Sequence, residues 1–315
     1  PLVVGDGLLD LRVSGEEAAP KTLGLYGGYE SLQGPILGME ARHVNFLDSG
    51  RAVALRLEGR GTGGEGSLLW SDPAILGSRW SLATGVSWET FTFADYDRQT
   101  GAWRTTLSRR LTRRITAEAI GAVTTNEMDT EVLSPEELGP GEYTTASGGL
   151  RLTFDYRDHP LLARDGWMVG LAAEAGGIDG DEQMTFLQGE VTAGWYQPLS
   201  DRWRFSLGGR ARVMLTPAEV SEVPIDMRLF NGGATSVRSF AEREMGPMSD
   251  DGDTPLGGLA SAVASAELSY EMIRDFEIAL FADVGTLGED SATFFRHDDL
   301  RYAIDSAIMA AGGRA

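Results

Sequence analysis

Residues Arg228–Pro247 read RLFNGGATSVRSFAEREMGP and interrupt an otherwise regular pattern. On both sides the chain alternates apolar and polar residues as β-strands do, whereas this stretch places Gly232 and Gly233 ahead of Arg238 in a long polar segment. If the flanking strands close into a barrel, this loop can fold into the lumen and pair the planar guanidinium with a carboxylate on the wall. Asp283 in the segment FADVG is the best candidate partner. The alternative, from residue types alone, is a surface loop with a solvated arginine.

The composition excludes several classes of protein. The chain has 315 residues, no cysteine, and 47 acidic against 27 basic residues, for a formal charge of -20. A disulfide framework and a cysteine metal site are therefore excluded, and an acidic chain of this kind is a poor binder of nucleic acid. We predict no cofactor, no metal site and no nucleic-acid partner.

Hydropathy leaves two classes of fold open. No window contains the roughly 18 to 20 consecutive apolar residues that a membrane helix needs, and the first residues lack a signal-peptide pattern. The chain is then either a soluble β protein or a membrane β-barrel, because alternating strands are not detected by hydropathy windows. The start at Pro1, without an initiator Met, indicates a fragment of a longer precursor.

Strand-length segments with period-2 alternation follow one another along the chain, and no long helix is predicted. Short turns alternate with longer polar loops, which is typical of the two rims of an up-and-down membrane barrel. The chain ends without the aromatic-terminated strand that normally closes such a barrel, so we expect the last strand or strands to be missing. About fourteen strands are predicted, at residues 22–31, 37–46, 52–60, 66–70, 78–93, 103–111, 115–125, 145–156, 168–175, 185–197, 203–215, 259–270, 276–285 and 300–311.

Several motifs in a fixed order resemble one known family. They are VPIDMRLFNGG at 223–233, VRSF at 237–240, Gly246-Pro247, the strand at 257–268, FADVG at 281–285, and a turn at 155–167. Together they resemble the outer-membrane assembly barrels that include BamA and TamA, whose barrel domain is of the bacterial surface-antigen type. The likeness runs from about residue 22 to the end, and Ser239 stands where the family's VRGF motif has glycine.

The resemblance implies an all-β, antiparallel, sixteen-strand transmembrane barrel in the bacterial outer membrane. Residues 1–21 would be the end of a periplasmic POTRA module and its linker, and residues 22–315 the barrel. A large loop at 218–258, after the eleventh strand, would fold into the lumen and be held by a lock between Arg238 and Asp283. The residues of the loop motif would be Gly232, Gly233, Val237, Ser239, Phe240, Gly246, Pro247 and Gly285.

The implied function is insertion or assembly of other β-barrel proteins, with the TamA-like branch favoured because the large loop is short. A client strand would add to the edge of the first strand, where Gly24, Gly27 and Gly28 weaken pairing. Those glycines are equally explained by close packing in a barrel wall. The expected partners are outer-membrane lipid or lipopolysaccharide, unfolded β-barrel clients, and periplasmic or inner-membrane accessory proteins.

Other functions remain open from the sequence. Related barrels export a passenger polypeptide or anchor a fused esterase domain, and a passive porin is a third class. An enzyme is the weakest hypothesis, because the three histidines are scattered and the glycine-rich run at 59–64 is expected in a turn rather than in a nucleotide loop. The arginine cluster at 109–114 is either a solvated turn or a contact for acidic lipid groups.

Overall fold

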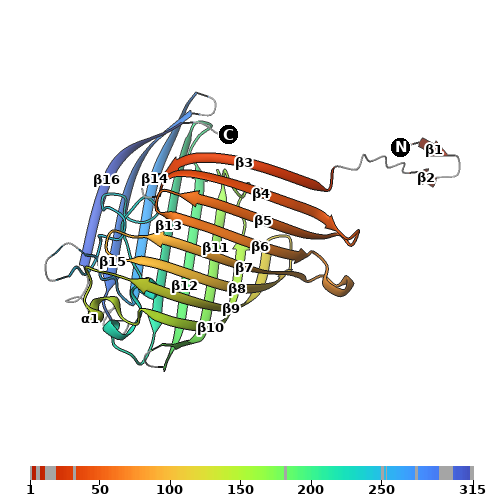
Figure 1. The fold of residues 1–315 in the computed structure, drawn as a ribbon. Helices are drawn as coiled ribbons and strands as arrows, with labels where there is room; N and C mark the ends of the chain where they lie inside the picture. Colours follow the sequence, from red (N-terminus) through yellow and green to blue (C-terminus); the bar gives the residue numbers. More distant parts are fainter. Residues whose placement is uncertain are drawn as a thin grey trace.

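The computed structural model describes residues 2–4, 8–10, 19–30, 33–180, 183–249, 252, 254–273, 276–290 and 301–312. Fourteen strands, β3 to β16, form one sheet in which every strand pairs antiparallel with its sequence neighbours (Figure 1). This confirms the predicted all-β, up-and-down architecture. The strands are β3 (Lys21–Glu30), β4 (Gly34–Phe46), β5 (Arg51–Arg60), β6 (Gly63–Asp72), β7 (Ser81–Thr92), β8 (Asp97–Arg110), β9 (Ile115–Asp129), β10 (Glu142–Asp155), β11 (Gly166–Asp179), β12 (Gln183–Pro198), β13 (Trp203–Leu215), β14 (Ala260–Ile273), β15 (Phe276–Gly288) and β16 (Arg301–Gly312).

The two faces of the sheet differ in chemistry because side chains alternate along each strand. On β5, Leu55 and Leu57 are exposed whereas Glu58 is buried. On β15, Leu280 and Val284 are exposed and Asp283 is 1% exposed. Apolar residues therefore cover the outer face and polar residues line the inner one, as a wall between lipid and a polar lumen requires.

Helical structure is limited to single turns. Within the described residues, α1 (Pro135–Leu138) is the only α-helix, and it begins with a capping box between Ser134 and Glu137. The 3-10 turns are η1 (Ile75–Gly77), η2 (Val220–Glu222) and η3 (Ile225–Met227). No helix in the described part of the chain is long and apolar enough to cross a membrane.

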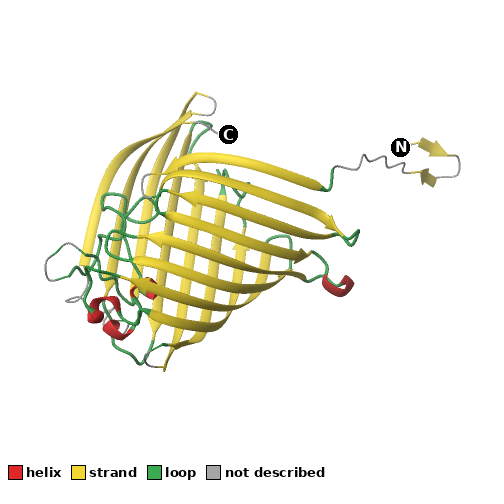
Figure 2. Cartoon of the chain, in the orientation of Figure 1, coloured by secondary structure: helices red, strands yellow, loops and turns green. Residues whose placement is uncertain are grey.

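The sheet curls, and most of the short helices and loops gather at one of its ends, whereas η1 lies at the other (Figure 2). We call the first of these ends the loop rim; it carries the connections after β5, β7, β9 and β13. The opposite rim carries the connections after β4, β6, β8, β10 and β12. Among the described strands, β3 and β16 lie at the two edges of the sheet and each is hydrogen-bonded to a single neighbour.

Two further features flank the sheet. Near the N-terminus β1 (Leu2–Val4) pairs with β2 (Leu8–Asp10) in a small hairpin of its own. The segment at 216–259, which we call the long loop, connects β13 to β14. It follows the eleventh strand of the sheet, as predicted.

The long loop lies on the inner face. At one side Thr254 donates to Asp95, next to β7, and at the other Arg238 donates to Asp283 on β15. A segment that reaches both places, half the sheet apart, must cross the concave side. The apolar core beneath it combines loop residues with inward residues near the loop rim, namely Tyr96, Met128, Leu133, Leu138, Tyr143, Ile178, Met184, Phe186, Met214, Val223, Ile225 and Leu259.

Candidate functional site

Arg238 and Asp283 are in direct contact in the structure. The Arg238 Nε atom donates to Asp283 Oδ2 over 2.7 Å and Nη2 donates to Oδ1 over 2.6 Å, a bidentate pair. The backbone N–H of Arg238 donates to the same carboxylate over 3.1 Å. The side chain of Asp283 has no exposed surface, so this charge depends on the arginine for its compensation.

Side chains of β14 and β15 surround the Arg238 guanidinium. Ser265 lies opposite Asp283 in the β14–β15 register, accepts from Arg238 Nη2 over 2.9 Å, and donates to Asp283 over 2.6 Å. Glu267 Oε2 is 3.6 Å from Nη1, and the Phe281 ring centroid is 3.3 Å from the guanidinium carbon. Ion pairing and a cation–π contact thus act on one side chain.

The small residues of the loop motif permit close approach of loop and wall. A Cβ on Gly285 would come within 2.5 Å of the Val237 side chain, and Val237 is fully buried. Gly246 packs against Leu287 of β15 in the same way. Gly232 has φ +106 and its position faces the Ala241 carbonyl, so a larger residue is excluded on both counts.

The remaining motif residues lie at the surface of the loop or within it. Gly233 has φ +84, Phe240 is half-buried and Pro247 is buried. Ser239 is exposed and its φ is not positive, so the conformation does not require glycine at this position. This explains how the loop keeps the Arg238 contact with serine in the motif.

Arg243 forms a second attachment of the loop, which the sequence did not indicate. Its guanidinium lies 3.6 Å from the ring centroid of Phe230 and 4.6 Å from that of Phe93, and it donates to Tyr96 Oη over 2.9 Å. Arg243 has φ +71, a conformation that costs a non-glycine residue about 1 kcal/mol or more. The aromatic contacts offset that cost.

Two ionisable groups of the loop lie near the apolar core. Tyr143 Oη donates to Asp226 Oδ1 over 2.5 Å, and burial raises the pKa of that carboxyl group. Arg228 is 5% exposed and donates to the Val223 and Leu256 carbonyls. Burial lowers the pKa of Arg228 to about 10. The Tyr143–Asp226 bond holds the loop to β10, whereas the bonds of Arg228 join two parts of the loop to each other.

The first strand of the sheet is held by an unusual set of side chains. Every residue of β3 is exposed except Tyr26, which is half-buried. Gly24 and Gly28, on the same face as Tyr26, have open space where a Cβ would be, and Gly27 approaches the Ile36 carbonyl. Tyr26 therefore provides the inward side-chain contact of β3.

Tyr26 passes over β4 to reach β5. Its ring lies on Gly38 of β4, where any Cβ would overlap the ring. Its hydroxyl donates to Glu58 Oε2 over 2.7 Å and accepts from Arg56 Nε over 2.8 Å. The glycine gap in β4 is what allows one side chain to connect β3 with β5.

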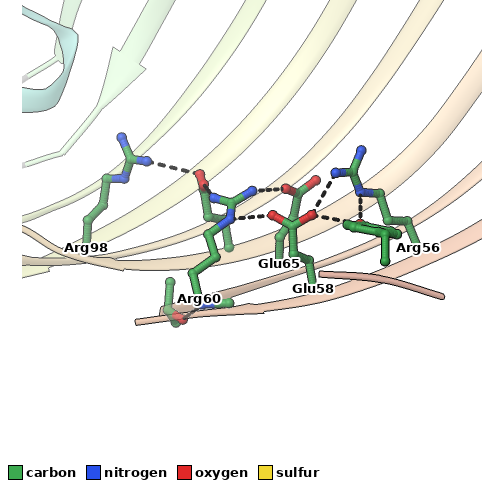
Figure 3. Close-up of polar contacts among 9 residues, drawn as sticks. Arg56, Glu58, Arg60, Glu65 and Arg98 are labelled. Carbon is green, nitrogen blue, oxygen red and sulfur yellow. Dashed lines mark hydrogen bonds and ion pairs between the residues drawn. The ribbon is translucent and has the colours of Figure 1, made fainter. Parts of the chain in front are cut away.

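A charged network continues from this contact along the inner wall (Figure 3). Arg60 donates to Glu58, Glu65 and Glu89 over 2.6, 2.6 and 3.0 Å, and Arg98 donates to Glu89 over 3.0 Å. Through these bonds β3, β5, β6, β7 and β8 are connected by side chains as well as by backbone ladders. The network is not evident from the sequence, because its links across strands, Tyr26 to Glu58 and Arg60 to Glu89, depend on strand register.

The two described histidines lie on different segments of the chain. His43 lies on β4 and His159 in the connection after β10, whereas His297 lies outside the described residues. Among the described side chains no group of three His, Asp or Glu residues is placed to hold a metal ion.

A curled sheet with an apolar outer face, and a long loop bonded inside it, defines an outer-membrane β-barrel. The chain belongs to the Omp85 superfamily, because the model of the Omp85 superfamily domain matches residues 45–311. This membership and the relatives below place it in the bacterial outer membrane.

Two relatives are similar in sequence. Outer membrane protein assembly factor BamA of Neisseria meningitidis is 24% identical over 343 residues, covering all of this chain and 42% of that protein. A SAM50-like protein of Schizosaccharomyces pombe is 31% identical over 168 residues, covering 50% of this chain and 34% of that protein. The chain thus spans less than half the length of either relative.

Two solved structures share the fold. BamA from Haemophilus ducreyi lacking POTRA domains 1–3 gives a TM-score of 0.78 at 16% identity, covering 95% of this chain and 68% of that chain. CdiB from Acinetobacter baumannii gives 0.59 at 14% identity, covering 93% and 53%.

Proposed function

We propose that this chain is the barrel of a BamA- or TamA-like factor that inserts β-barrel clients into the outer membrane. The observation that carries the proposal is β3, an edge strand of the described sheet whose side chains are almost all exposed. Membership of the Omp85 superfamily supports the same role. Residues 1–21 would belong to the end of a periplasmic POTRA module.

The physical task is to provide hydrogen-bond partners for a client that enters lipid. Each unpaired backbone group costs several kcal/mol in the bilayer core. An edge strand offers a row of free N–H and C=O groups to which a client strand can add. In β3, Gly24 and Gly28 contribute no side-chain packing, so the strand separates from its neighbours at low cost.

The long loop would keep the lumen filled while this edge exchanges partners. Arg238 attaches the loop to Asp283 on β15, and Arg243 attaches it to Tyr96 between β7 and β8. Neither of these two contacts involves the first four strands, β3 to β6. The chain would act without cofactor or covalent chemistry, as Omp85 barrels such as BamA do. Its partners would be client strands, outer-membrane lipid or lipopolysaccharide, and periplasmic or inner-membrane accessory proteins.

Replacing Gly24 and Gly28 with valine tests the role of the edge. Both positions have open space, and valine favours strands by up to about 1 kcal/mol, so β3 should become more rigid while the barrel still folds. We expect client levels in the membrane to fall several-fold with unchanged heat-modifiability of the barrel itself.

The matched control is Gly121→Val in β9, which also has open space but lies in the middle of the sheet. It should leave client levels unchanged. Equal client levels in wild type and the Gly24→Val/Gly28→Val variant would contradict the proposed function.

The alternative is export of a passenger polypeptide through the lumen, and the similarity to CdiB is the observation that favours it. Export requires the long loop to leave the lumen, so Arg238→Ala should increase passage. If the chain inserts clients at the β3 edge, Arg238→Ala should instead lower the amount of inserted client, because a loosened loop weakens the wall. The direction of the Arg238→Ala effect separates the two functions.

A further inference from the structure

Five arginines form a cluster at the rim opposite the long loop. Arg79 lies just before β7, and Arg109, Arg110, Arg113 and Arg114 lie at the end of β8 and in the turn to β9. The two segments adjoin, because Ser81 pairs with Ser108 and the Arg109 guanidinium lies 5.3 Å from the Trp80 ring centroid. All but Arg109 are exposed.

None of the five forms an ion pair with a carboxylate among the described residues. The carboxylates nearby already have partners. Asp72 accepts from Arg51, Asp155 accepts from Arg157, and Asp158 accepts from backbone amides. The cluster therefore presents a net positive charge, offset only in part by Asp155 near Arg114, in a chain whose overall charge is -20.

Aromatic side chains place this cluster at the membrane surface. Arg114 lies 5.0 Å from the Tyr156 ring centroid, and Tyr156 stacks on Trp167 at 4.5 Å. Trp167 is paired with Trp195 in the β11–β12 register, and each is about two-fifths exposed. A belt of exposed aromatic residues near one rim marks the interface between hydrocarbon and headgroups. The arginines lie just beyond this belt, at the level of lipid phosphates.

We propose that this cluster binds the headgroups of anionic glycerophospholipids and so fixes the depth and tilt of the first half of the barrel. Guanidinium groups form paired hydrogen bonds with phosphate, and lipid with a net negative headgroup is favoured over zwitterionic lipid because the cluster carries a net positive charge. The inference is independent of the assembly function, since it concerns only the seating of the wall in lipid.

Lipid retention by the purified, detergent-folded chain tests the proposal. The chain is mixed with equal amounts of phosphatidylglycerol and phosphatidylcholine of the same acyl length, and bound lipid is counted by native mass spectrometry. We expect wild type to retain phosphatidylglycerol preferentially. The Arg110→Gln/Arg113→Gln/Arg114→Gln variant should lose about a hundredfold in that preference, given roughly fivefold per arginine.

Two controls separate charge from folding. Lysine at the same three positions should keep most of the preference, whereas Arg42→Gln/Arg104→Gln/Arg210→Gln removes equal charge from the strands and should not change it.

Equal retention of both lipids by wild type, or an unchanged preference in the glutamine variant, would overturn the proposal. So would binding of polyglutamate with no lipid preference, because the cluster would then recognise an acidic protein segment. Competition by millimolar inorganic phosphate would indicate a free-anion site instead.

Discussion

Arg238 compensates the buried charge of Asp283, and this sets the effect of removing it. Arg238→Ala leaves a carboxylate without its bidentate partner in a site that has no exposed surface. We expect a loss of about 3–5 kcal/mol in the free energy of unfolding, measured by urea titration of the folded barrel. Arg238→Lys should lose less, because a charge remains while the paired geometry does not.

Arg104→Ala is a matched control, since Arg104 is an exposed arginine on β8 for which no ion pair is present among the described residues. Its effect should stay within about 0.5 kcal/mol. Adding Asp283→Asn to Arg238→Ala should recover part of the loss, because the uncompensated charge disappears. Additive effects of the two substitutions would show that the pair contributes no coupling.

Tyr26 is expected to control how readily β3 separates from the sheet. Tyr26→Phe keeps the ring on Gly38 but removes the hydroxyl bonds to Glu58 and Arg56. Backbone amides of β3 should then exchange with solvent several-fold faster, while those of β10 stay unchanged, as measured by hydrogen–deuterium exchange. Tyr29→Phe is the control on the same strand, because Tyr29 is 78% exposed. Equal acceleration by both substitutions would contradict a role specific to Tyr26.

At the scale of single residues, sequence motifs identified some contacts and missed others. Arg238 and Asp283 were proposed as partners from their residue types and then from the family motifs, and they lie together in the structure. Arg243 and Tyr26 were not identified, because their partners are aromatic rings or glycines on other segments. Such contacts depend on register and on empty space above a glycine, neither of which is encoded near the residue itself.

Among the elements, the long loop carries a group with a predictable pH dependence. Burial raises the pKa of Asp226, opposed by the hydrogen bond from Tyr143 and by the charges of Arg98 and Arg243. The protonated carboxyl group of Asp226 therefore contributes fully to stability below the unfolded pKa of about 3.9. This contribution is lost as pH rises through the pKa of the folded state. Asp226→Asn should match wild type in acid and exceed it in stability at neutral pH, as measured by urea midpoints across pH.

Asp158, in the turn after β10, provides a control of opposite sign. Hydrogen bonds from backbone amides, first that of Arg164, lower the pKa of its carboxyl group. Its contribution is present above the unfolded pKa and is lost as pH falls through the folded value. Asp158→Asn should therefore cost stability at neutral pH and not in acid. A pH-independent difference for Asp226→Asn would contradict the assignment.

The strands were predictable from period-2 alternation, and the predicted 203–215 strand matches β13 at both ends. Errors occurred where glycine and threonine replace apolar residues. The run at 59–64 does span the turn between β5 and β6, but β6 begins at Gly63 rather than at 66, and β8 begins at Asp97 rather than at 103. Hydrogen bonds of the ladder, rather than side-chain pattern, extend these strands.

On the scale of the whole molecule, the two rims differ in charge and in the segments that lie over them. The loop rim carries acidic segments and the folded core of the long loop, whereas the opposite rim carries the arginine cluster and the aromatic belt. Composition gave only the net charge of -20, since separating the rims requires the order and direction of the strands. The sixteen-strand count and the POTRA assignment remain predictions.

The reach of the long loop divides the wall into two mechanical parts. Within the described residues its hydrogen bonds to the wall end on Asp95 and later residues, so the strands from β7 onward are cross-braced through the interior. The strands β3 to β6 have backbone ladders and the Tyr26–Arg98 charge chain, but none of the described loop residues forms such a hydrogen bond with them. Under lateral pressure from the bilayer, bending would concentrate in these four strands, and the barrel would deform like a cylinder stiffened along one side.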